Sequence, residues 1–147
     1  MRITGTMSLS VGLLSLLVFS AGSAANAQIT NVVEATISHD FIVGTKTLPA
    51  GKYVFQMQQG SSGAVMTVTS ENGKASDVFT VRESQAPAVP AHTQLIFRRY
   101  GDKEFLSKVF QAGSKTGVAV AGESKLEKEL IAKGQQASEH TEENGGQ

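Results

Sequence analysis

Residues 64–82 read AVMTVTSENGKASDVFTVR, and this stretch decides the fold because two predicted strands flank a turn. Strands are expected over 64–70 and 75–82; in the second segment Ala75, Phe79 and Val81 lie on one face, at the period of two that is typical of a strand. Asn72 and Gly73 between the two segments both accept positive φ and favour a type I′ turn. The stretch therefore predicts an antiparallel hairpin.

The same period continues on both sides of this hairpin. It predicts strands over 33–43 (bent near His39 and Asp40), 53–58, 93–100, 104–111 and 118–121. Residues 83–92 contain Pro87 and Pro90, which cannot donate to a ladder, so this segment is expected to be a loop. Six to seven short strands predict an all-β fold, either an antiparallel β-sandwich or a small incomplete barrel. The pattern does not decide between the two.

The period changes near the C-terminus. Ser124 and Glu127 have the spacing of a capping box, and Leu126, Leu130 and Ile131 form an apolar stripe. One short helix is expected here, ending before Gly134. Residues 135–147 contain no large apolar side chain and are expected to form a disordered tail.

The N-terminus has the pattern of a signal peptide. Arg2 supplies positive charge, an apolar core covers 11–19, and small residues lead to Ala25-Asn26-Ala27. Cleavage is expected between Ala27 and Gln28, which makes 1–27 the leader and 28–134 the exported β domain. The apolar core is about half the length that spans a bilayer, so no membrane span is expected after leader removal. The domain is then periplasmic or secreted.

The composition of the 147 residues excludes several kinds of anchor, cross-link and partner. Without cysteine, the chain has neither the residue that carries a lipid anchor nor a disulfide. The formal net charge is zero and the basic residues are scattered, so no nucleic-acid partner is expected. An envelope or extracellular partner remains the expectation.

Residues 40–53, DFIVGTKTLPAGKY, resemble a segment F-x-V-G-x-K-x-L-P-A-G-x-Y shared by a group of uncharacterised small exported bacterial proteins. Residues 73–76 (GKAS), 97–106 (FRRYGDKEFL) and the charged helix at 124–130 extend the resemblance. It implies the β fold and export. It implies no activity.

Residues with catalytic chemistry do not form a recognisable set. His39, His92 and His140 lack ligand spacing, so neither a metal nor another cofactor is expected. Glu34, Asp40, Asp77 and Glu104 lie on predicted strands, and a pair of them facing a cleft is the basis of one alternative function, a small hydrolase.

Arg99 is the least ordinary residue, because alternation places it on the core face with Leu95 and Phe97. We expect an edge salt bridge, with Asp77 as a candidate partner; the alternative is an anionic ligand held by Arg99 at a barrel mouth. A second alternative function is a small-ligand carrier whose apolar pocket contains Phe41, Tyr53, Phe55, Phe97 and Phe105. The leading hypothesis is an exported, non-enzymatic β domain, a binding or cell-envelope structural module.

Overall fold

The computed structural model describes residues 32–60 and 63–144, so the expected leader at 1–27 lies outside the described residues. Ten strands and one helix follow one another along this part of the chain. Their bounds are β1 Val32–Ile37, β2 Phe41–Val43, β3 Lys46–Leu48, β4 Gly51–Gly60, β5 Gly63–Ser70, β6 Ser76–Gln85, β7 Thr93–Tyr100, β8 Lys103–Phe110, β9 Thr116–Val120, α1 Lys125–Ala132 and β10 Ser138–Asn144. The all-β fold with one short C-terminal helix is confirmed, with more strands than expected.

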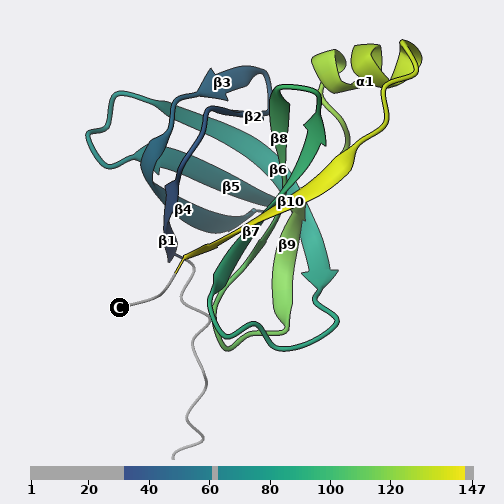
Figure 1. Ribbon diagram of the computed structural model, residues 1–147. Helices are drawn as coiled ribbons and strands as arrows, with labels where there is room; N and C mark the ends of the chain where they lie inside the picture. The colour runs from purple at the N-terminus through teal and green to yellow at the C-terminus, as the bar shows by residue number, and fades with distance from the viewer. Residues whose placement is uncertain (1–31, 61–62, 145–147) are drawn as a thin grey trace, which may run out of the picture.

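All ten strands belong to one sheet (Figure 1). Its main path runs β1-β4-β5-β6-β9-β8-β2-β3, and β7 pairs with the other edge of β8 and carries β10. Strand β8 is therefore central, and buried apolar side chains lie on both of its faces. The pairing is antiparallel except between β2 and β8, which are parallel at Ile42 and Phe105.

The sheet curls until its edge strands β1 and β10 become neighbours. Side chains of β10 bridge them: the amide of Thr36 donates to Asn144 Oδ1 at 2.6 Å, and the amide of Ser38 donates to Glu142 Oε1 at 3.2 Å. We call this line of contacts the seam. A single sheet whose edge strands β1 and β10 meet in this way, while β3 remains an edge, fits the incomplete barrel rather than a sandwich of two sheets.

The core lies inside the curl and follows the predicted alternation. In β6, Phe79 and Val81 are buried while Val78 and Thr80 are exposed. The main apolar cluster draws on most strands: Ala35, Ile37, Phe41, Val43, Leu48, Tyr53, Phe55, Met66, Val68, Phe79, Val81, Leu95, Phe97, Leu106 and Val109. A smaller cluster of Ile42, Tyr100, Phe105 and Leu130 packs α1 against the sheet.

Three expectations about the strands were wrong in detail. The strand expected over 33–43 is two strands, because the chain bends at residues 38–40 and β2 pairs with β3 and β8 instead of continuing β1. Strand β6 runs on to Gln85, pairing with β9, so the predicted loop begins after it. The turn at Asn72 is longer than type I′: Ser70 O accepts from Gly73 N, and Gly73 alone has positive φ, +70°.

The expectation of a disordered tail over 135–147 was wrong for residues 138–144. Strand β10 pairs antiparallel with β7 from Ser138↔Arg99 to Asn144↔Thr93. The backbone ladder and the seam side chains hold this strand, and neither interaction needs a large apolar residue. Hydrophobic patterning therefore gave no sign of it.

Helix α1 begins where predicted, since the Ser124 hydroxyl accepts from the amide of Glu127 at 3.2 Å. The return half of the capping box is replaced: the Glu127 carboxylate binds Arg98 and Tyr100. Gly134 has φ +80°, as a residue that ends a helix requires. Within the described ranges, no helix is both long and apolar enough to cross a membrane.

Candidate functional site

Two histidines and a glutamate converge at the seam. His39 lies in the bend after β1, Glu104 near the start of β8, and His140 in β10. His39 Nε2 lies 2.6 Å from Glu104 Oε2, and His140 Nδ1 lies 2.8 Å from the same oxygen. One ligand atom from each of the three residues lies within 4.8 Å of the others. Three separate elements thus bring nitrogen and oxygen donors to one point.

The core and the seam fix the position of this cluster. The ring of His39 meets Phe97 edge-on at 4.8 Å between centroids, and the His140 ring lies 5.2 Å from the His39 ring. Glu104 is buried, with 7% of its side chain exposed, while the imidazoles are partly exposed at 23% and 35%. The cluster is therefore a half-open polar site above an aromatic floor.

Glu142 holds His39 from the other side. Its Oε1 lies 3.2 Å from His39 Nδ1, and it also bonds to the hydroxyl of Ser38. In the neutral tautomer whose proton is on Nδ1, His39 donates to Glu142 and its Nε2 presents a lone pair to Glu104. His39 Nε2 is buried and has no hydrogen bond of acceptable geometry among the described residues.

Arg99 lies at the rim of the same cluster. As alternation predicted, it shares the face of Phe97, but this face opens at the end of the barrel, so 53% of the Arg99 side chain is exposed. Its Nε lies 3.3 Å from Glu104 Oε1, which makes Glu104 its partner in the expected salt bridge. The candidate partner Asp77 was wrong: Asp77 lies 4.0 Å from Lys46 Nζ.

Tyr53, Phe55 and Phe97, the other candidate ligand-binding residues, belong to the main core. Their exposed fractions are 1%, 0% and 0%. Phe41 stacks edge-on against Tyr53 at 5.1 Å, and it lies 6.0 Å from Phe97. Burial, with the nearby Asp40, raises the pKa of Tyr53. The two cavities described below are not lined by these three residues.

The acids considered for hydrolysis have structural partners. Asp40 Oδ1 accepts from the amide of Ala50 at 3.0 Å and so fixes the turn before β4. Asp77 Oδ1 accepts from the amide of Val78 at 2.9 Å. Glu104 belongs to the histidine cluster. Glu34 is exposed on β1.

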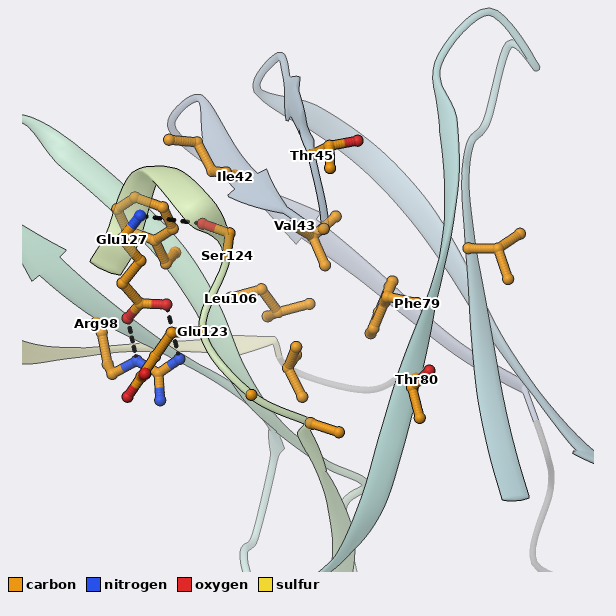
Figure 2. A pocket seen from close by; sticks show the side chains of 16 residues that line it. Ile42, Val43, Thr45, Phe79, Thr80, Arg98, Leu106, Glu123, Ser124 and Glu127 are labelled. Carbon is orange, nitrogen blue, oxygen red and sulfur yellow. Dashed lines mark hydrogen bonds and ion pairs between the residues drawn. The ribbon is translucent and has the colours of Figure 1, made fainter. Parts of the chain in front are cut away.

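A first cavity, of about 260 Å³, opens between the β2–β3 hairpin and β6, beneath the start of α1 (Figure 2). Arg98 and Glu127 meet at its edge: Arg98 Nε donates to Glu127 Oε1 at 2.6 Å and Nη2 donates to Oε2 at 3.1 Å. The hydroxyl of Tyr100 adds a bond of 3.2 Å. Burial and then the neighbouring Glu127 carboxylate raise the pKa of Tyr100. These contacts satisfy the charged groups and anchor α1.

A second cavity, of about 190 Å³, lies at the opposite end of the strands from the histidine cluster. It is lined near the start of β1 and the end of β8, whereas His39 follows the end of β1 and Glu104 is near the start of β8. Its apolar lining residues are Val33, Met57, Ala64, Met66, Val109 and Val118. Arg82, Glu83 and Gln111 add polar groups to the lining.

Sequence reasoning missed the histidine cluster because its members are 36 to 101 positions apart. His39 and His140 were judged to lack ligand spacing, and spacing rules detect only ligands on one local element. No family model, no curated protein and no solved structure matches this chain.

Proposed function

We propose that the chain is an exported, non-enzymatic binding module that holds a small apolar molecule in the cavity lined by Met57 and Met66. The observation that carries the proposal is this cavity of about 190 Å³ with mainly apolar walls at one end of the barrel. Concave apolar sites with a few polar groups are the usual form of small-ligand sites. The proposal retains the small-ligand carrier, but it places the ligand in this cavity and not among the buried aromatic residues that the sequence suggested.

The cavity volume limits the ligand. A dry cavity of about 150 Å³ lined by apolar residues accepts a benzene ring, while drug-sized ligands need roughly 300 Å³ or more. A volume of about 190 Å³ therefore suits one ring or a short branched chain. Met57 and Met66 favour such a ligand, because an unbranched thioether side chain adapts to different shapes.

The two methionines also supply the test. The whole chain contains four methionines, Met1, Met7, Met57 and Met66. We would label the methionine methyl groups with ¹³C in the full chain, assign them with Met57→Leu and Met66→Leu, and titrate with toluene. The methyl signals of Met57 and Met66 are expected to shift together and saturate.

A cavity-filling variant and a surface variant complete the test. Ala64→Leu places a larger side chain in the cavity and is expected to abolish the shifts, whereas Val78→Leu enlarges a residue that is 59% exposed and is expected to leave them unchanged. Methyl signals that ignore toluene, or that respond equally in Ala64→Leu, would refute the proposal.

Export is tested separately by N-terminal sequencing of the protein recovered from outside the cytoplasm. The mature chain is expected to begin at Gln28. A chain that begins at Met1 would contradict the signal-peptide prediction.

A further inference from the structure

We propose that His39 Nε2, Glu104 Oε2 and His140 Nδ1 form a binding site for one divalent transition-metal ion of the zinc class. This site is independent of the apolar cavity at the other end of the barrel. Two imidazole nitrogens and one carboxylate oxygen are a ligand set found in zinc sites that keep an open fourth position. Such donors favour zinc and its neighbours over calcium and magnesium, which prefer oxygen ligands alone.

The first argument is the contact between His39 and Glu104. Their atoms Nε2 and Oε2 lie 2.6 Å apart, yet the geometry is not that of a hydrogen bond, and Nε2 is a buried atom without such a partner in the described part of the chain. When His39 Nδ1 donates to Glu142, the close pair consists of two lone pairs. Arg99 offsets the charge of Glu104 at Oε1, on the side away from His39, and a cation bound by both Nε2 and Oε2 would relieve the contact between the two lone pairs.

The second argument is the shared oxygen. His140 Nδ1 approaches Glu104 Oε2 at 2.8 Å from β10, so a single carboxylate oxygen faces two imidazole nitrogens. Zinc bonds of about 2.0–2.2 Å in a tetrahedron place neighbouring ligand atoms about 3.3 Å apart. The Glu104 distances of 2.6 and 2.8 Å are shorter than this value, while the three ligand atoms span up to 4.8 Å. Metal binding therefore needs a retreat of the Glu104 oxygen by roughly half an ångström and an approach of the two imidazoles to each other, both by side-chain rotation.

The third argument is the set of residues around the three ligands. Glu142 lies 3.2 Å from His39 Nδ1, and a carboxylate that orients a ligating histidine through its other ring nitrogen is a recurrent feature of metal sites. Arg99 lies 3.3 Å from Glu104 Oε1 and leaves Oε2 to face the histidines. Glu142 and Arg99 are positioning residues. Both imidazole side chains are partly exposed, at 23% and 35%.

The proposal is tested by metal binding to the full chain made without a histidine tag. After treatment with a chelator, isothermal titration with Zn²⁺ is expected to show one ion per chain, and Co²⁺ is expected to give the visible absorption bands of a four- or five-coordinate site. Mg²⁺ is expected to give neither signal.

The chain offers a matched control, because its third histidine, His92, is exposed and outside the cluster. His39→Gln, Glu104→Gln and His140→Gln are each expected to weaken Zn²⁺ binding by at least about 100-fold, and Glu142→Gln by about 10- to 100-fold. His92→Gln is expected to bind as the parent does. Far-UV circular dichroism checks that each variant folds.

Hydrogen exchange provides a second readout. An ion bound by β10, β8 and the bend after β1 would fasten the seam, so Zn²⁺ is expected to slow exchange of the Thr36 and Ser38 amides in the parent and in His92→Gln, and not in His140→Gln. The proposal is overturned if the parent takes up no Zn²⁺ at micromolar concentration. Equal losses in His92→Gln and His140→Gln would overturn it as well, because binding would then be nonspecific.

Discussion

The ion pair between Arg98 and Glu127 allows an asymmetric prediction, because its two partners differ in burial. Glu127 retains 2% of its side-chain exposure and Arg98 retains 31%. Removal of one partner leaves the other charge unpaired, and the cost depends on whether water can reach that charge. We therefore expect Arg98→Ala to destabilise the protein more than Glu127→Ala.

The magnitudes follow from the same geometry. Breaking a buried pair from one side costs about 3–5 kcal/mol, and the cavity beside the pair admits some water, so we expect about 3 kcal/mol for Arg98→Ala. In Glu127→Ala the arginine regains solvent, and the main losses are its two hydrogen bonds and the acceptor of Tyr100. We expect about 1.5 kcal/mol for this variant.

The assay is urea unfolding followed by far-UV circular dichroism, with the free energy of unfolding extrapolated to water. Glu129→Ala, which removes an exposed carboxylate from the same helix, is the control and is expected to change stability by less than about 0.5 kcal/mol. The double variant is expected to cost about 3 kcal/mol, which means a coupling of about 1.5 kcal/mol. The reasoning is refuted if Glu127→Ala costs as much as Arg98→Ala, or if the two costs add in the double variant.

Three further predictions concern packing, pH and the seam. Gly117→Ala would bring a Cβ into the Phe110 ring, 2.8 Å from Cε1, and against the carbonyl oxygen of Val109. We expect the free energy of unfolding to fall by about 2 kcal/mol and the Tm in calorimetry to fall by roughly 8 °C. An unchanged Tm would contradict the close packing. The pKa of Tyr100 is raised, so the native state keeps this proton to a higher pH than the unfolded state does. The contribution of Tyr100 to stability is therefore complete below about pH 10 and is lost as the pH rises above that value. In Tyr100→Phe the urea midpoint is expected to fall less steeply from neutral to alkaline pH than in the parent, and an unchanged slope would show that Tyr100 does not contribute. Asn144→Ala removes the acceptor of the Thr36 amide, and this amide is expected to exchange roughly tenfold faster in hydrogen-exchange mass spectrometry. The amide of Val68 in the core is the reference and is expected to exchange at an unchanged rate. Equal exchange of the Thr36 amide in the variant and the parent would show that Asn144 does not hold the seam.

The strands with a buried face could be predicted from the sequence, and those without one could not. Alternation identified the core face of β6, since Phe79 and Val81 are both buried. Strand β10 was not predicted because both of its faces are polar and its stability comes from pairing with β7. The local pattern of apolar and polar residues predicts which side chains are buried. The pairing of an edge strand depends instead on where the rest of the sheet ends.

The candidate sites show the same division. Alternation placed Arg99 on the face of Phe97 correctly, but the identity of its partner depended on register, which pairs Arg99 with Glu104. His39 and His140 are brought together only because the sheet curls and β10 follows β7. A convergence of this kind depends on the topology of the whole barrel, and no local spacing contains it.

The seam has a consequence for the order of folding. Its contacts join residues 108 positions apart, such as Thr36 and Asn144, so they close one of the largest loops in the chain. During synthesis β10 is the last of the described strands to leave the ribosome. Until then the edges of β1 and β7 have no partner along the seam. An unpaired strand edge accepts the same strand from another molecule. Chains held at high concentration before closure are therefore expected to exchange β10 and to form swapped dimers with two intact seams.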